Sequence, residues 1–138
     1  MATRLPKGYS PDDNEPFMNA RQREYFRRKL QDWKDDIVKG TRETVNGLKA
    51  ESSQHPDESD RAAAESEKAL ELRTRDRARK LISKIDEALK RVEDGSYGYC
   101  EETEEPISVQ RLEARPIATL SIEAQERHER MERTHRDD

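Results

Sequence analysis

The chain has 138 residues, of which 30% are hydrophobic, 5% are aromatic and 42% are charged, and its formal net charge is -4. This composition excludes a wide globular core, so the apolar residues must form a narrow stripe along helices if the chain folds. The slight acidic excess argues against bulk binding to nucleic acid or to anionic membranes. No apolar run is long enough to span a bilayer, and a single cysteine cannot form an internal disulfide.

Residues 1–16 are rich in Pro, Asp, Asn and Gly and show no apolar periodicity, so we expect a flexible N-terminal tail. This stretch also lacks the apolar segment of a secretory signal, which leads us to expect a soluble, cytoplasmic protein. The remaining chain divides into a helical region over residues 17–94 and a small module over residues 95–138.

A first long helix is expected to begin near Asn19 and to end near Glu51. Asn19 suits the N-cap position, and Gln22 three residues later completes a capping-box pattern. Apolar residues then recur at spacings of four and three, which is typical of a heptad seam. The seam is strong at first and weakens later: Phe26, Leu30, Trp33, Ile37, then Thr41, Thr44 or Val45, and Leu48.

A second long helix is expected from about Glu58 to Asp94, because Pro56 interrupts the first pattern and Gly95 suits the position after a helix end. Its apolar seam comprises Ala78, Leu81, Ile85, Ala88 or Leu89, and Val92. Two long helices with a short connection fold back on each other. We therefore predict an antiparallel coiled-coil hairpin over residues 17–94, with its tip near residues 53–62.

The periodicity changes after Gly95. The segments "YGYCE" and "ISVQRL" are strand-like and are separated by the polar stretch "ETEEP", which predicts a small β-hairpin. A last helix should follow, with Ser121 as its N-cap. The predicted fold class is therefore mainly α, with a long coiled-coil hairpin on a small base that contains a zinc-finger-like β-hairpin and a C-terminal helix. The base is too small to be stable alone, so it should pack against the hairpin.

Four positions in this base have the spacing of two C-x-x-C pairs: Cys100, Thr103, Ser121 and Ala124. A structural zinc ion needs four ligands, usually thiolates or imidazoles, whereas hydroxyls are poor ligands and a methyl group is none. Nearby donors that remain as alternatives are Glu101, Glu123 and His128. The soft-ligand set is absent, so we predict no metal and a degenerate zinc-finger-like module in which Cys100 is a small buried apolar residue.

Two groups of charged residues are candidates for binding. Asp57 and Asp60 lie near the hairpin tip, and acidic residues are favoured at the start of any helix because they cap its free N–H groups. The same carboxylates at the end of a narrow projection are also suited to approach a metal or a basic loop. The second group is basic and suits an anion, although it is equally typical of a salt-bridged surface: Arg77, Lys80, Lys84 and Arg115.

Several short motifs follow one another in a fixed order over residues 17 to 130. They are "FMNARQREYFRRKLQDW", D-x-x-D-x-A at Asp57, Asp60 and Ala62, L-x-L-R-x-R-D-R at Leu70 to Arg77, then G-Y-C and R-L-E-A-R-P. In this order they resemble the DksA/TraR family. In zinc-bearing members of that family the four C-x-x-C positions are cysteines, and three of them are replaced here, so the sequence resembles a zinc-independent member.

The resemblance implies a regulator that binds bacterial RNA polymerase and does not itself bind specific DNA sequences. The hairpin would enter the secondary channel, and the tip residues Asp57, Asp60 and Ala62 would approach the active site. The implied outcome, strengthened by ppGpp in the stringent response, is inhibition of ribosomal RNA promoters and activation of amino-acid biosynthesis promoters. We expect a monomer that needs no zinc and has no cofactor, with ppGpp as its effector.

The resemblance also places the effector. Positions that match the family's ppGpp pocket include Leu81, Lys84 and Arg115, whereas a basic residue of that pocket is Gln125 here. The missing positive charge predicts weaker coupling to ppGpp.

Other functions remain open from the sequence. A transcript-cleavage factor of the same channel would use the tip carboxylates to hold Mg²⁺, a plain coiled-coil adaptor would associate with itself, and a zinc protein would contain metal. We expect no enzyme in its own right, because the sequence suggests no nucleophile–base pair and no phosphate-binding loop.

Overall fold

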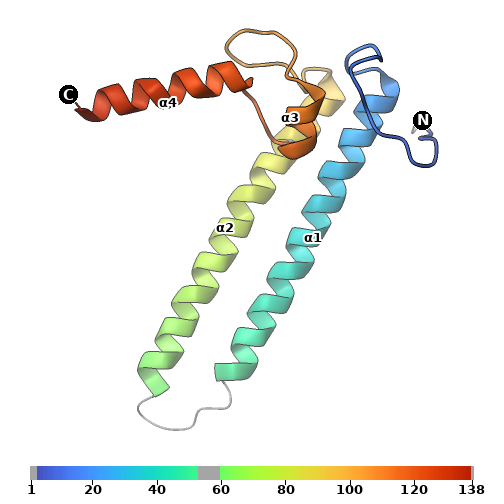
Figure 1. The fold of residues 1–138 in the computed structure, drawn as a ribbon. Coiled ribbons are helices and arrows are strands. Elements are labelled where there is room, and N and C mark those ends of the chain that lie inside the picture. Colours follow the sequence, from blue (N-terminus) through green and yellow to red (C-terminus); the bar gives the residue numbers. More distant parts are fainter. Residues whose placement is uncertain (1–2, 53–59, 138) are drawn as a thin grey trace. The chain divides into compact units, whose positions relative to one another are not determined.

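The computed structural model describes residues 3–52 and 60–137, and only the backbone for residues 51, 52, 60, 136 and 137. The described chain is mainly helical, as predicted, and consists of α1 (Ala20–Ser52), α2 (Asp60–Asp94), α3 (Val109–Ala114) and α4 (Ile122–Asp137) (Figure 1). No helix among these residues is long and apolar enough to cross a membrane.

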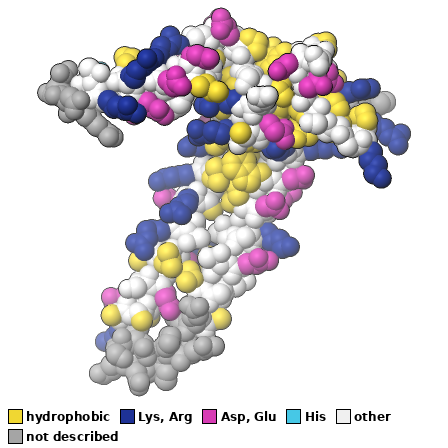
Figure 2. Space-filling model, viewed as in Figure 1, with side chains coloured by type: hydrophobic (Ala, Val, Ile, Leu, Met, Phe, Trp, Pro, Cys, Tyr) yellow, Lys and Arg dark blue, Asp and Glu magenta, His cyan; other side chains and the backbone are white. Residues whose placement is uncertain are grey.

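The chain forms two compact units. The hairpin unit is Gln31–Asp86, and the terminal unit combines Met1–Leu30 with Glu87–Asp138. In the space-filling view, hydrophobic side chains are gathered on the terminal unit and are more scattered on the hairpin unit (Figure 2). Each unit therefore has its own packing.

The first long helix begins where the sequence predicts. Asn19 accepts a hydrogen bond from the backbone N–H of Gln22 at 2.9 Å, as an N-cap does. The side chain of Gln22 reaches back one residue further than in a standard capping box, because its Oε1 accepts from the N–H of Met18 at 2.8 Å. The N–H of Asn19 instead donates to the carbonyl of Pro16.

The second long helix ends at Asp94, directly before Gly95, as predicted. Gly95 has a φ of +88°, which glycine adopts without strain. The carbonyl of Arg91 accepts hydrogen bonds from three successive backbone N–H groups, those of Gly95, Ser96 and Tyr97. The predicted N-cap of this helix, Asp57, lies outside the described residues.

In the hairpin unit, α1 and α2 lie side by side and run in opposite directions (Figure 1). Val45 and Ile85 are buried, so Val45 rather than Thr44 occupies the seam. Lys34 forms an ion pair with Asp86 at 2.7 Å. Between the helices lies an open groove of about 340 Å³, lined mainly by small side chains: Ile37, Gly40, Thr41, Thr44, Thr74, Arg77, Ala78 and Leu81. The apolar seam is therefore thin, as the sequence predicts.

The terminal unit contains most of the buried apolar side chains: Phe26, Leu30, Ala88, Val92, Tyr97, Cys100, Ile107, Val109, Leu112 and Ala124. Phe26 and Tyr97 have ring centroids 5.7 Å apart, and the Tyr97 hydroxyl donates to the carbonyl of Pro116 at 2.7 Å. The small module thus shares one core with the start of α1 and the end of α2, as expected for a part that is too small to fold alone.

The prediction of a β-hairpin is wrong for its second strand. The residues described here contain one isolated bridge, between Tyr99 and Pro106, and the segment predicted as a strand forms α3. The Ser108 side chain accepts a hydrogen bond from the N–H of Arg111, which starts a helix at that point. Val109 and Leu112 are both buried, and their spacing of three suits one face of a helix rather than one face of a strand.

Residues 3–19 contain no helix or strand. Pro11 is nevertheless buried, and the side chains of Tyr9 and Glu15 contact α1. The flexibility that the sequence suggests stays a prediction.

Candidate functional site

The tip carboxylates fall largely beyond the described part of the chain. Asp57 lies outside the described residues, and only the backbone of Asp60, the first residue of α2, is described. Ala62 is exposed in the first turn of α2. The assignment of these three residues as an active-site-facing tip stays a prediction.

Two predicted effector residues lie on one face of α2 in the hairpin unit. Leu81 is half-buried and lines the groove, and Lys84, three residues later, is exposed. Among the described residues Lys84 has no ion pair, whereas Lys80 pairs with Asp76 at 3.0 Å. Lys80 is thus part of an ordinary salt-bridged surface, and the ammonium of Lys84 has a charge available for a ligand.

The third predicted effector residue, Arg115, belongs to the terminal unit. It is exposed and follows the last residue of α3, and its backbone N–H donates to the carbonyl of Arg111 at 2.7 Å. Its guanidinium makes no ion pair with any residue that the structure describes. Arg111 differs, because its Nε donates to the carbonyl of Leu120 at 2.8 Å. One arginine of the motif therefore holds the local fold, and the other is presented to solvent.

A cluster that the sequence analysis missed fixes α3 against α1. Oε1 of Glu113 accepts hydrogen bonds from the Tyr25 hydroxyl at 2.5 Å and from the Lys29 ammonium at 2.8 Å. Burial tends to raise the pKa of Glu113, but the bonds from Lys29 and Tyr25 outweigh this effect and lower it. Burial and the bond to Glu113 raise the pKa of Tyr25 to about 12. The one sequence signal is the i, i+4 spacing of Tyr25 and Lys29 on α1.

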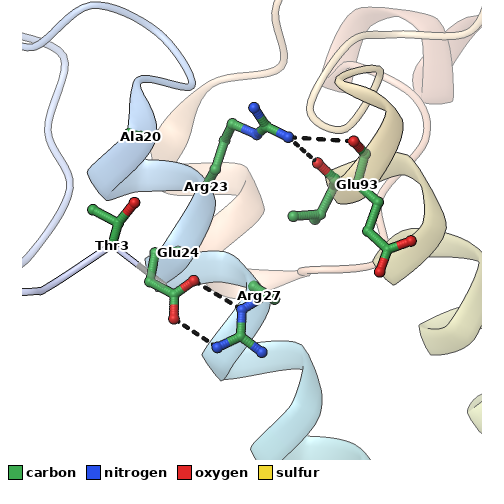
Figure 3. A pocket seen from close by; sticks show the side chains of 7 residues that line it. Thr3, Ala20, Arg23, Glu24, Arg27 and Glu93 are labelled. Carbon is green, nitrogen blue, oxygen red and sulfur yellow. Dashed lines mark hydrogen bonds and ion pairs between the residues drawn. The ribbon is translucent and has the colours of Figure 1, made fainter. Parts of the chain in front are cut away.

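A second cluster joins the start of α1 to the end of α2 around a cavity of about 250 Å³ (Figure 3). Arg23 donates to the carbonyls of Val92 at 2.6 Å and Glu93 at 3.4 Å, which caps the end of α2. Glu24 is buried and pairs with Arg27 at 2.6 Å and with Arg28 at 2.9 Å.

In this cavity the carboxylate of Glu24 is held by hydrogen bonds from arginines of the same helix. The hydrogen bond from Arg27 lowers the pKa of Glu24 to about 2, with help from Arg28 and against the opposing effect of burial. The polar groups of Arg23 and Glu24 are occupied by neighbours in the same unit, so this cavity is a structural junction.

Of the four positions with C-x-x-C spacing, Cys100 has a sulfur that accepts hydrogen bonds from two of the others, Thr103 and Ser121. Cys100 is 2% exposed, and its sulfur accepts from the Thr103 hydroxyl and the backbone N–H of Ser121. The Ser121 hydroxyl accepts from the N–H of Ala124 at 3.2 Å, and the Ala124 side chain is buried. Ser121 is therefore the N-cap of α4, as predicted.

The predicted burial of Cys100 is confirmed, and hydrogen bonds to its sulfur add a polar feature that the sequence did not indicate. Burial alone would raise the pKa of the thiol, but hydrogen bonds from the Thr103 hydroxyl and from the N–H groups of Ser121, Thr103 and Glu102 lower it to about 6. The surroundings of this sulfur therefore favour the thiolate.

These residues do not fit a structural zinc ion. Zinc needs lone pairs from four ligands, whereas Thr103 and Ser121 direct protons at the sulfur and Ala124 has no donor. The Nε2 of His128 pairs with Glu102. Within the described ranges, no three His, Cys, Asp or Glu side chains are placed to hold one metal ion.

Comparison with known families finds two matches in this chain. Residues 22–92 match the family described as "DnaK suppressor protein DksA, N-terminal domain". Residues 95–130 match the family described as "Prokaryotic dksA/traR C4-type zinc finger". Together they cover most of the two long helices and of the small module.

Curated relatives agree with these matches. A protein of Caulobacter vibrioides named "RNA polymerase-binding transcription factor DksA" is 67% identical over 130 residues, which cover 94% of this chain and 92% of that protein. The protein of the same name from Escherichia coli K12 is 46% identical over 115 residues, which cover 83% of this chain and 76% of that protein.

A solved structure of transcription factor DksA2 from Pseudomonas aeruginosa has a similar fold. Its TM-score is 0.78 at 40% sequence identity, and the match covers 89% of this chain and 93% of that one. The similarity therefore extends over nearly the whole of both proteins.

Proposed function

Because the chain belongs to the DksA/TraR family, we propose that it is a transcription factor that binds bacterial RNA polymerase. The observation that carries this proposal is the 67% identity to a relative named for that activity, over 92% of the relative's length. We expect a monomer that acts in the cytoplasm, without enzymatic activity of its own and without direct recognition of specific DNA sequences.

The proposed mode of binding uses the two-helix hairpin. The hairpin unit, which is two helices wide, enters the secondary channel of polymerase, and the tip residues Asp57, Asp60 and Ala62 face the active site. The protein then acts by binding one conformational state of the promoter complex better than another. The thin seam between α1 and α2 supports this mode, because a wide core would not suit a channel.

The proposed effector is ppGpp, bound with contributions from Leu81, Lys84 and Arg115. The exposed, unpaired cations of Lys84 and Arg115 within the described chain support this, because phosphate groups bind such side chains with charge-assisted hydrogen bonds. Gln125 donates a bond to Glu129 at 3.3 Å and has no positive charge, so coupling to ppGpp is weaker than in relatives with a basic residue there.

We further propose that activity does not need zinc. The hydrogen bonds that converge on the Cys100 sulfur support this, because they occupy the place in the module where zinc-bearing members have a metal.

Transcription in vitro tests the function. Purified polymerase would be assayed on a ribosomal RNA promoter and on an amino-acid biosynthesis promoter, with and without ppGpp and a metal chelator. The wild-type protein should inhibit the first promoter and activate the second, ppGpp should strengthen both effects, and the chelator should change neither. Asp60→Asn should remove the regulation, whereas Glu65→Gln, which changes an exposed carboxylate further along α2, should leave it intact.

Two results would contradict the proposal. Cleavage of backtracked RNA in the same reactions would indicate a transcript-cleavage factor. Self-association without binding to polymerase would indicate a coiled-coil adaptor.

A further inference from the structure

The N-terminal segment, residues 3–18, is tied to α1 by a buried glutamine. Gln22 is fully buried, and its Nε2 donates to the carbonyl of Asp12 at 3.1 Å and to Oε2 of Glu15 at 3.3 Å. Its Oε1 accepts from the N–H of Met18. A buried amide with all these partners satisfied holds one geometry, because each lost bond would leave a polar group without a partner.

Tyr9 adds a second attachment. Its ring packs edge-on against Tyr25 of α1 with centroids 6.0 Å apart, and its hydroxyl donates to Glu15 at 2.7 Å. The segment is thus anchored on α1 at two places.

The far end of the segment lies against the knuckle, which we define as residues 95–124. The Phe17 ring packs edge-to-face against Tyr99, with centroids 5.3 Å apart. A Cβ built on Gly98 would lie 3.0 Å from Cζ of Phe17 and 3.2 Å from Cε of Met18. A side chain at position 98 would therefore crowd Phe17 and Met18, which would have to shift by a few tenths of an ångström.

We propose that the N-terminal segment is a strap that holds the first turn of the knuckle, at Gly98 and Tyr99, against α1 and so stabilises a module that lacks a metal cross-link. A zinc ion cross-links the two ends of such a module through four ligands, and this chain has only one of them. The strap supplies an attachment of another kind: Phe17 packs on Gly98 and Tyr99, directly before Cys100, and Gln22 joins the strap to α1. This role does not depend on polymerase binding.

The chain's one cysteine provides the test. Cys100 is 2% exposed and lies beside a cavity of about 370 Å³, so we expect a thiol reagent such as Ellman's disulfide, which must reach the sulfur itself, to react faster when the knuckle opens. Phe17→Ala removes the ring that contacts Gly98 and Tyr99, and we expect the reaction rate under native conditions to rise by about tenfold. The helix content by circular dichroism should stay unchanged.

Two glycines provide a matched control. Gly95 and Gly98 have φ values of +88° and +92°, so alanine is strained at both, but a Cβ on Gly95 meets nothing within 4 Å. Gly98→Ala should raise the reaction rate, and Gly95→Ala should raise it much less. In Gly98→Ala/Phe17→Ala the two effects should not add, because both act through the same contact.

Val45→Ala controls for general loss of stability, because Val45 is buried in the hairpin unit and should not alter the thiol rate. If Phe17→Ala reduces the helix content, Phe17→Leu and a deletion of residues 1–16 replace it. An unchanged thiol rate in variants with native helix content would overturn the proposal. An equal rise in Val45→Ala and Phe17→Ala would also overturn it.

Discussion

The hydroxyl of Tyr25 on α1 donates a 2.5 Å hydrogen bond to the carboxylate of Glu113 on α3, and this bond joins residues 88 positions apart in the sequence. Because α3 has only six residues, it cannot be stable alone and depends on such attachments.

Tyr25→Phe should therefore lower the free energy of unfolding by about 1 kcal/mol, the usual net value of one hydrogen bond. Glu113 is 40% exposed on its side chain, so solvent screening keeps the effect modest. Urea unfolding measures it. Tyr99→Phe is the control, since the Tyr99 hydroxyl has no hydrogen bond within the described chain; an equal loss in both variants would argue against a specific bond.

Glu24 should make stability depend on pH in the acid range. Its folded pKa of about 2 lies below the ordinary value of 4.5, so its contribution is present above pH 4.5 and is lost as the pH falls toward 2. Glu24→Gln should remove about 2 kcal/mol at neutral pH and flatten the decline between these pH values. Denaturation at several pH values tests this, with exposed Asp32→Asn as control; an unchanged slope in Glu24→Gln would refute it.

The hydroxyl of Thr103 should help to hold the Cys100 thiolate. Thr103→Val removes one donor, and we expect the thiol pKa to rise from about 6 by about one unit. Ultraviolet absorbance of the thiolate during a pH titration measures this change.

The same thiol predicts a second pH effect. Its folded pKa lies below the ordinary value of 9.0, so its contribution to stability is complete above pH 9 and is lost as the pH falls through about 6. In Cys100→Ser this dependence should disappear, and its persistence would mean that another group titrates in that range.

Metal removal should have no effect on the natural chain. A chelator should leave its melting temperature unchanged, because the described residues offer no zinc ligand set. The combined variant Thr103→Cys, Ser121→Cys and Ala124→Cys restores four thiols and should bind one zinc ion, after which chelation should lower its melting temperature. Stoichiometric zinc in the purified natural protein would contradict this prediction.

Substitution of the two arginines of the R-L-E-A-R-P motif should have different effects, one on effector binding and the other on stability. Arg115→Ala should reduce the ppGpp-dependent part of regulation about tenfold without changing the melting temperature, because its guanidinium is exposed and unpaired in the described chain. Arg111→Ala should lower the melting temperature instead, because it removes the bond to Leu120. The assays are ppGpp titration in transcription and thermal melting; identical behaviour of the two variants would argue against the assignment of Arg115.

Local signals in the sequence predicted the helices well. Asn19, Gln22 and Gly95 act through backbone groups a few residues away, so their effect is readable without the fold. The seam of Val45 and Ile85 follows from periodicity alone.

The rest depends on partners far apart in the sequence. The bond between Tyr25 and Glu113 exists only once α1 and α3 are packed. The lowered pKa of Cys100 needs the N–H of Ser121, which the return of the chain to the start of α4 supplies. The strand prediction over residues 107–112 failed because the apolar residues of that segment suit either period, and the Ser108 cap favours the helix α3.

The groove of the hairpin unit, with Gly40 and Thr41 facing Thr74, has a mechanical consequence. Leucine side chains at these positions would interlock the two helices and set a single register between them. Small residues leave that register weakly enforced, so the helix pair can bend and twist along this stretch at little energetic cost. We therefore expect the hairpin unit to bend and twist more easily than the terminal unit, which contains most of the buried apolar side chains.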